Sequence, residues 1–320
     1  MDQELENEIM YRMMPYLTNE QAMMLKKTLD TINEDSDLEL TNTEIVNQFF
    51  HAKSLEGLSE RTLQYYRNTI DAMLLSIGKD VRAVTTEDLR GYLTEYQNKN
   101  GASNTTVDNV RRNLSSFFRW MEDENYILKS PVRRIHKVRT AKTVKETYSD
   151  EDIERMRDSC TNLRDLALID LLATTGMRVG ELVLLNREDI DFQDRECIVF
   201  GKGDKERVVY LDAKAKLHLL DYLVSRTDDS PALIVSLRKP YQRLKIGGVE
   251  TMLRKKGLAL GIHRVHPHKF RRTMATMAID KGMPIEQLQQ ILGHQKIDTT
   301  MHYAMVKQSN VKNAHRRYIG

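Results

Sequence analysis

The stretch ECIVFGKGDKERVVYL, residues 196 to 211, decides the fold class, because it interrupts an otherwise helical sequence pattern. Its apolar residues alternate with other residues and include several Val and Ile, and Gly-Lys-Gly-Asp lies in the middle. Alternation with a period of two predicts strands, and a Gly-containing centre predicts a tight turn. We therefore predict a β-hairpin with Lys202 at its turn, in a chain that is mainly helical with a small β-sheet.

The sequence before this hairpin is helical. Residues 1 to 35 show apolar residues at helical spacing, and residues 44 to 128 show four further amphipathic patterns. Ser59 and the Thr85-Thr86 pair predict helix N-termini, and Asn100-Gly101 predicts a helix C-terminus. The fourth pattern has a single apolar stripe, formed by Val107, Val110, Leu114, Phe117, Phe118 and Met121. Four short amphipathic helices predict one small helical domain.

A second domain is expected after residue 148, since 320 residues exceed the usual size of one domain. Ser149 is a predicted N-cap, with Asp152 three residues later. A nearly all-apolar helix is predicted from Leu163 to Thr175. Between the domains, residues 129 to 147 include Pro131 and show weak periodicity, which predicts an extended basic linker.

Composition limits the class of protein. Hydrophobic residues make up 40% and charged residues 30%, which is typical of a soluble globular chain. No apolar run approaches the about 18 residues that span a bilayer. The acidic start MDQELENE is unlike a secretory signal, and the two unpatterned cysteines, Cys160 and Cys197, favour a reducing cytosol.

The net charge of +3 hides strongly charged segments. Residues 1 to 40 carry ten acidic and three basic side chains. Residues 125 to 145 carry seven basic side chains and no acidic one, and residues 237 to 272 carry eleven basic side chains against Glu250 alone. Either basic cluster could be a solvated surface, but two of them around one set of reactive residues favour a nucleic acid. We assign DNA contacts to Arg111, Arg112, Arg133, Arg134, Lys137, Arg139, Lys142, Arg238, Lys239, Arg243 and Lys245.

Four short stretches contain candidate reactive residues: GMRVGEL with Arg178 and Glu181, FGKGDKERVV with Lys202, HPHKFRRT with His268 and Arg271, and LGHQKIDTTMHYA with His294 and Tyr303. Each alone has a structural explanation, such as an Arg–Glu pair, a solvated lysine or a half-buried tyrosine. A metal site built on His263, His266 and His268 is a rival, although no Cys, Asp or Glu lies within that stretch.

Taken together, these residues suit phosphoryl transfer without a metal. Two arginines and two histidines can neutralise the charge that gathers on a phosphodiester under attack. Lys202 can protonate a leaving oxygen. Tyr303 is a poor nucleophile unless a cationic site stabilises its oxyanion, and these residues would supply one. The sequence contains no P-loop pattern, so no ATP is expected.

The ordered set GMRVGEL, GKGDKER, HKFRRT, LGH and HYA resembles the tyrosine recombinases, the phage-integrase and Xer-like class. The resemblance implies that Arg178 and Arg271 bind the scissile phosphate, that Lys202 is the general acid and that Glu181 supports Arg178. It implies that His268 and His294 hydrogen-bond the phosphate and assist proton transfer, and that Tyr303 forms a 3′-phosphotyrosine. Two residues depart from the family's His-x-Leu-Arg-His pattern, Phe270 and Arg272, and we expect little loss from them.

The resemblance also implies an architecture and partners. The segments would be an N-terminal helical extension (1–40), a SAM-like core DNA-binding domain (41–128), the basic linker (129–147), a mixed α/β catalytic domain (148–306) and a tail (307–320) that docks on a neighbouring protomer. The family fold is a C-shaped clamp around DNA. The expected partners are double-stranded DNA with paired recombination sites, further copies of the chain forming a tetramer, and an accessory or directionality factor. No cofactor, metal or membrane is expected, and the expected location is the cytoplasm, at the nucleoid.

Two other functions remain open from sequence alone. A DNA-binding regulator without catalysis would need a missing reactive residue, and none is missing. A type IB topoisomerase shares this kind of site, but the short helical first domain and the Xer-like motif spacing argue against it. The DNA target and the outcome of recombination (integration, excision, inversion or resolution) are not encoded in the residues that contact phosphate.

Overall fold

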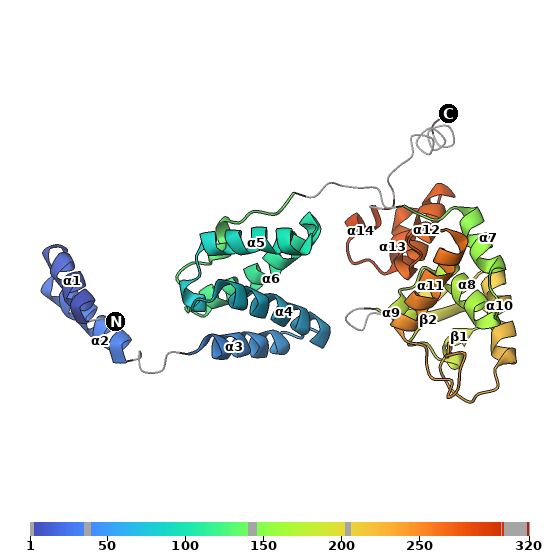
Figure 1. The fold of residues 1–320 in the computed structure, drawn as a ribbon, viewed down its shortest axis with the longest axis horizontal. Helices are drawn as coiled ribbons and strands as arrows, with labels where there is room; N and C mark the ends of the chain where they lie inside the picture. The colour runs from blue at the N-terminus through green and yellow to red at the C-terminus, as the bar shows by residue number, and fades with distance from the viewer. Residues whose placement is uncertain are drawn as a thin grey trace. The chain divides into compact units, whose positions relative to one another are not determined.

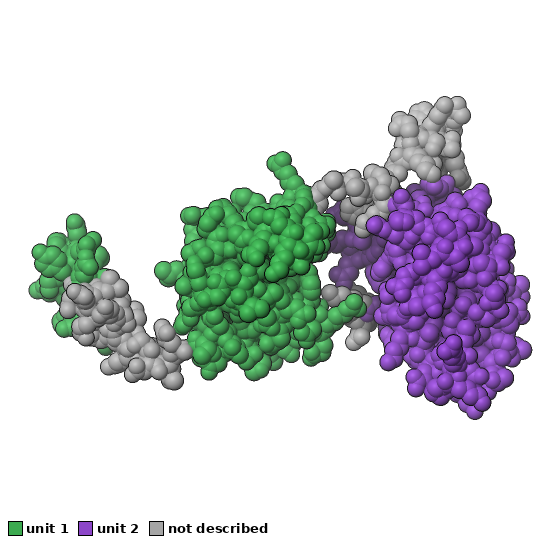
Figure 2. Space-filling model, viewed as in Figure 1, with its two compact units in different colours: residues 1–142 green, residues 143–320 purple. Residues whose placement is uncertain are grey.

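The computed structural model describes residues 3–34, 40–139, 146–201, 206–301, 303 and 319. The chain divides into two compact units, residues 1–142 and residues 143–320 (Figure 1 and Figure 2). Within the described ranges, no helix combines the length and the apolar character that crossing a membrane would require.

Among its described residues, the first unit contains helices and no β-strand. Its α-helices are α1 (Gln3–Met13), α2 (Asn19–Glu34), α3 (Asn42–Leu55), α4 (Glu60–Ile77), α5 (Thr86–Asn100) and α6 (Asn104–Asp123). The predicted helix boundaries are confirmed where the caps are local: the Ser59 side chain accepts from the Thr62 backbone, and Gly101 ends α5 in the left-handed conformation.

The core of the first unit forms around α6. All six residues of its predicted apolar stripe are buried, and Phe117 meets Phe49 of α3 edge to face with ring centroids 5.2 Å apart. Such aromatic pairs add about 0.5–1.5 kcal/mol beyond the burial of their area.

The segment expected to be an extended linker is partly folded against this core. Residues Pro131–Arg134 form a 3₁₀ turn (η4), Val132 is buried, and the Pro131 carbonyl accepts from the Thr86 hydroxyl at 2.8 Å. Farther along, the Val138 backbone donates to buried Asp108 at 3.2 Å. The structure thus places residues 131–139 within the first unit, since apolar side chains in the basic run find partners on α5 and α6.

The second unit is mainly helical with one sheet. Its elements are α7 (Asp150–Asp158), α8 (Leu163–Thr175), α9 (Val179–Leu182), β1 (Ile190–Asp191), β2 (Glu196–Phe200), β3 (Glu206–Tyr210), α10 (Ala213–Ser225), α11 (Ile246–Leu260), α12 (Pro267–Asp280), α13 (Ile285–Leu292) and α14 (Ile297–Met301). The predicted hairpin is confirmed, with β2 and β3 antiparallel and Cys197 opposite Val209. The two-residue strand β1, which completes the sheet in the order β1-β2-β3, was not predicted.

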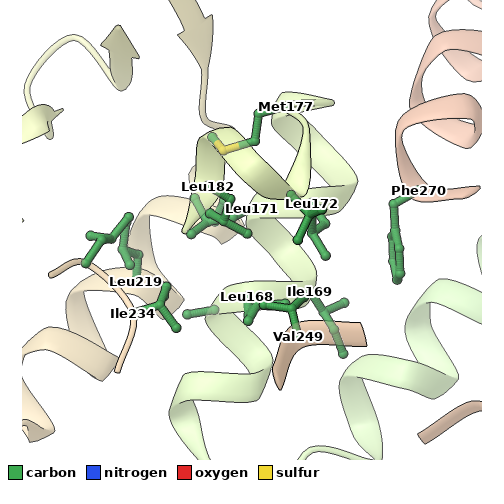
Figure 3. Packing of buried hydrophobic residues seen from close by; sticks show 14 of the residues in the cluster. Leu168, Ile169, Leu171, Leu172, Met177, Leu182, Leu219, Ile234, Val249 and Phe270 are labelled. Carbon is green, nitrogen blue, oxygen red and sulfur yellow. The ribbon is translucent and has the colours of Figure 1, made fainter. Parts of the chain in front are cut away.

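Helix α8 contributes several residues to the hydrophobic core of the second unit, part of which is drawn in Figure 3. Leu168, Ile169, Leu171 and Leu172 are fully buried, so several faces of this helix are covered. Asp170, also fully buried, accepts from Arg157 Nε of α7 at 2.5 Å and is hydrogen-bonded to the α10 histidine His218. A helix fixed on several sides gives the loop at its C-terminal end a defined position.

Candidate active site

Arg178 stands where α8 ends and α9 begins. Gly176 ends α8 with a φ of 60°, in the left-handed region that favours glycine, and a Cβ there would lie 2.1 Å from the Met274 side chain. Glu181, which is 6% exposed, accepts from the Arg178 backbone at 2.7 Å and from its guanidinium at 2.8 Å. Glu181 is thus placed to orient Arg178, as the resemblance implies. The Arg178 side chain is 36% exposed and can reach an external anion.

Arg207 on β3 also belongs to this site, although the sequence pattern did not predict it. Its two terminal nitrogens donate to the two Glu181 carboxylate oxygens at 2.8 and 2.6 Å, and its Nε donates to the Ile291 carbonyl at 2.8 Å. Its side chain is only 8% exposed. A charged residue on a short strand normally indicates a solvated face, and the partners of Arg207 lie 26 and 84 positions away, so no local signal identifies it.

Arg271 is the most deeply buried of the predicted site residues that the structure describes, at 3% exposed. Its terminal nitrogens donate to the Gly176 carbonyl at 2.7 Å and to the Leu292 carbonyl at 2.5 Å. These bonds satisfy a buried cation and hold the end of α8 close to the end of α13. Burial, and then the positive charges of Arg178 and Arg207, lower the pKa of Arg271 to about 10, which leaves it charged at neutral pH.

His294 lies next to Arg271 and is neutral at pH 7. Its Nε2 is 2.9 Å from an Arg271 terminal nitrogen, and its Nδ1 is 2.9 Å from the Thr300 hydroxyl. Because arginine only donates, Nε2 accepts, and Nδ1 carries the proton. Burial, and then the charges of Arg271 and Arg178, lower the pKa of His294 to about 4. Both ring nitrogens are occupied, so a contact between His294 and a phosphate requires one of these bonds to open.

Tyr303 stacks on His294, with ring centroids 5.9 Å apart and an interplanar angle of 25°. Its backbone N–H donates to the Thr300 carbonyl at 2.9 Å. Its ring packs against the small apolar cluster formed by α12 and α13, which includes Ala275 and Leu292. The tyrosine is therefore held beside His294, which contacts the buried guanidinium of Arg271.

His268 lies in the first turn of α12, three residues before Arg271, and is exposed. Partial burial, and then the charges of Arg271 and Arg178, lower its pKa, which indicates that the imidazole is close to both arginines. The structure thus brings together five of the six predicted reactive residues. The sixth, Lys202, lies outside the described residues, as does Lys142 of the predicted DNA contacts.

The two departures from the family pattern have internal roles. Phe270 is fully buried and packs on Tyr148 with ring centroids 4.8 Å apart. Arg272 donates through Nε to the Glu146 carbonyl at 2.8 Å. Both side chains therefore attach α12 to the segment that precedes α7.

The histidine cluster that was the rival metal site does not gather suitable ligands. Among the residues that the structure describes, no three His, Cys, Asp or Glu side chains are arranged to hold a metal ion. Burial, and then the charge of Arg272, lower the pKa of His266.

Most of the predicted DNA contacts are exposed. The exposed residues are Arg112, Arg133, Arg134, Lys137, Arg139, Arg238, Lys239 and Lys245. Two others have internal partners. Arg111, with 14% of its side chain exposed, donates to Asp108 at 2.9 Å. Arg243 donates to the Val183 and Leu185 carbonyls at 2.9 and 2.7 Å, which satisfies backbone groups at the end of α9.

Stability is expected to fall as the pH drops from about 6.5 to 4. The pKa of His294 is lowered to about 4 in the folded chain from its ordinary value of 6.5, so the unfolded chain binds more protons in this window. Substituting His294→Gln should remove on the order of 2 kcal/mol of this pH-dependent loss. Urea unfolding of both proteins across this pH range measures the free energy of unfolding. If that free energy changed equally with pH in both proteins, the assignment to His294 would be contradicted. His266 and His268 contribute in the same direction in both proteins.

The comparisons with known proteins cover both units. A model described as the phage integrase family matches residues 146–310, and a model of the phage integrase N-terminal SAM-like domain matches residues 45–128. The tyrosine recombinase XerC of Oceanobacillus iheyensis is 32% identical over 279 residues, which cover 82% of this chain and 91% of that protein. The tyrosine recombinase XerA of Pyrococcus horikoshii is 28% identical over 280 residues, covering 86% and 94%.

Two solved structures show the same fold. The XerH site-specific recombinase bound to a palindromic difH substrate, a post-cleavage complex, has a TM-score of 0.68 at 18% identity and covers 97% of this chain and 93% of that one. A lambda integrase dimer bound to a COC′ core site also has a TM-score of 0.68, at 20% identity, covering 85% and 79%.

Proposed function

The chain belongs to the phage integrase family, and on this premise we propose that it is a tyrosine-type site-specific recombinase that cuts and rejoins DNA. The observation that carries the proposal is the arrangement around Arg271. This buried cation contacts His294, on which Tyr303 stacks, and Arg178 lies close enough to lower the pKa of both Arg271 and His294.

We propose the following chemistry for these residues. The Tyr303 hydroxyl attacks the phosphorus and passes its proton to the neutral imidazole of His268, forming a 3′-phosphotyrosine, while the bond from phosphorus to the 5′ oxygen breaks. Lys202 donates a proton to that oxygen, which leaves as a hydroxyl. Arg178 and Arg271 stabilise the charge on the non-bridging oxygens, assisted by His268 and His294. A 5′ hydroxyl of another strand then reverses the step, so that the phosphate bond energy is retained without ATP.

The exposed basic residues would hold the duplex. Arg112, Arg134 and Lys137 of the first unit, and Arg238 and Lys245 of the second, would neutralise backbone phosphates. Arg111 and Arg243 would act indirectly, since their internal bonds shape the surfaces that carry the others. Such contacts fix position on DNA without reading its sequence, so the target site has to be measured.

Strand exchange needs several copies, and we propose that the N-terminal extension contacts a second copy on DNA. Supporting this, large apolar side chains are exposed on α1, α2 and the turn between them, including Tyr11 at 80%, Tyr16 at 82% and Met24 at 75%. Exposed apolar groups of this size often mark interaction surfaces. The oligomer would be a tetramer assembled on paired sites, acting at the nucleoid and open to an accessory or directionality factor.

The test is to capture the intermediate. The full chain is expressed in cells that carry its native flanking DNA, protein–DNA adducts are isolated under denaturing conditions, and both the DNA and the linked peptide are sequenced. We expect one recurring DNA site, linked to the peptide that contains Tyr303. A peptide containing Tyr318 would reassign the nucleophile.

The same experiment separates the alternatives. Adducts at scattered sequences would favour a type IB topoisomerase activity, and DNA bound without any adduct would favour a regulator without catalysis. Comparing adduct yield with and without a chelator would test a metal-dependent reaction.

A further inference from the structure

The Glu181 carboxylate lies between two arginines. Two of its hydrogen bonds come from Arg178, through the backbone and the guanidinium, and two come from the terminal nitrogens of Arg207. Burial alone would raise the pKa of Glu181, but the bonds from Arg207, and then those from Arg178, lower it overall. The carboxylate therefore stays ionised inside the site.

The second arginine preserves the positive charge of the site. A buried Glu181 with Arg178 as its sole partner would cancel the charge that Arg178 needs to attract a phosphate. Arg207 supplies a second cation, and its own side chain is only 8% exposed, which leaves it little access to DNA. The trio of two arginines and one carboxylate keeps a net positive charge, and Arg178 is its more exposed cation, at 36%.

Arg207 also joins parts of the site that are far apart in sequence. Its Nε donates to the Ile291 carbonyl at 2.8 Å, just before the loop that carries His294. Gly293 in that loop lies against the Arg207 side chain, since a Cβ on Gly293 would be 2.7 Å from Arg207 Cδ. The residue lies on β3, the second strand of the β2–β3 hairpin. A single side chain thus links the hairpin, Glu181 at α9 and the His294 loop.

We infer that Arg207 is a positioning residue for DNA cleavage, which neutralises Glu181 so that Arg178 keeps its charge for the phosphate and which holds the His294 loop in place. The inference rests on the proposed function. A purely structural role for Arg207 would predict lost stability without a specific effect on the chemical step.

The test combines charge removal with charge compensation. The single-turnover rate of adduct formation is measured on the DNA duplex recovered with the wild-type chain. We expect Arg207→Gln to lower this rate roughly 100-fold, the scale of one lost electrostatic contact in a catalytic site. Arg207→Lys keeps the charge but cannot reach Glu181 and Ile291 together, so its loss should be about tenfold.

The cleavage rate of the double variant Glu181→Gln with Arg207→Gln distinguishes the two roles. This variant removes the carboxylate that Arg207 neutralised, so it should be about tenfold faster than Arg207→Gln alone. A structural role predicts instead that the double variant is as slow as Arg207→Gln or slower. That result would overturn the inference.

Arg226 provides a matched control in the same unit. Its side chain is 3% exposed and donates to Asp228 at 2.5 Å and to the Ala232 carbonyl at 2.6 Å, and neither partner belongs to the site. Arg226→Gln should lower the melting temperature while the cleavage rate of the folded protein stays within about threefold of wild type. Melting curves of all variants establish which are folded, and Arg207→Lys carries the test if Arg207→Gln does not fold.

Failure of the inference can be told apart from failure of the proposed function. A wild-type chain that forms no adduct defeats both. A wild-type chain that forms adducts at the same rate as Arg207→Gln defeats only the role of Arg207.

Discussion

Replacing Tyr303 with phenylalanine is expected to abolish covalent attachment to DNA and to leave DNA affinity within about twofold, because phosphate contacts dominate that affinity. The substitution removes a single hydroxyl. The ring keeps its stacking on His294 at 5.9 Å and its packing on the apolar cluster of α12 and α13, so the fold should be retained. Loss of a covalent nucleophile costs on the order of 10⁶ in rate. Adduct yield on denaturing gels and a binding titration measure the two effects separately.

Tyr210→Phe is the matched control for this prediction. Tyr210 lies on β3 of the same unit and is 52% exposed, and the proposed chemistry gives its hydroxyl no role. The Tyr210→Phe protein should form adducts at the wild-type rate. Adducts formed by Tyr303→Phe would show that another residue is the nucleophile.

Substituting Arg271→Lys should lower the cleavage rate by roughly 10²–10³-fold, even though the positive charge is retained. The arginine fork reaches the Gly176 carbonyl, the Leu292 carbonyl and His294 at once, and a single ammonium cannot reproduce that geometry. At least one buried carbonyl would lose its donor, so the free energy of unfolding should fall by about 1–3 kcal/mol. Single-turnover cleavage and urea unfolding measure the two losses.

The loss of cleavage rate and the loss of stability are separated by a control arginine whose side chain is also buried. Arg226→Lys removes a guanidinium with a buried side chain from Asp228 and nearby carbonyls, outside the site. We expect it to lose comparable stability and to keep its cleavage rate. If Arg271→Lys behaved in the same way, Arg271 would be a structural residue and the phosphate would be held elsewhere.

The features that the sequence determined by itself are those fixed by neighbours in the chain. Ser59 caps α4, Ser149 caps α7 and Gly176 ends α8 where the pattern predicted, because a cap forms with backbone groups two to four residues away. The hairpin and the Arg178–Glu181 pair follow from the same short spacing. Motif order was enough to list the candidate reactive residues, five of which the structure gathers in one place.

Only the tertiary structure decided the internal partners that lie far apart in the sequence. Arg207 is as charged as Lys202 and lies in the same short run, yet its partners are 26 and 84 positions away. The sequence predicted that Arg243 contacts DNA, but in the structure it donates to carbonyls about 60 positions earlier. Residues 129 to 147 were predicted to be an extended linker, but Val132 and Val138 of this segment pack against the core of the first unit. A buried ionised group needs a partner wherever the fold brings one, and local periodicity carries no information about that distance in sequence.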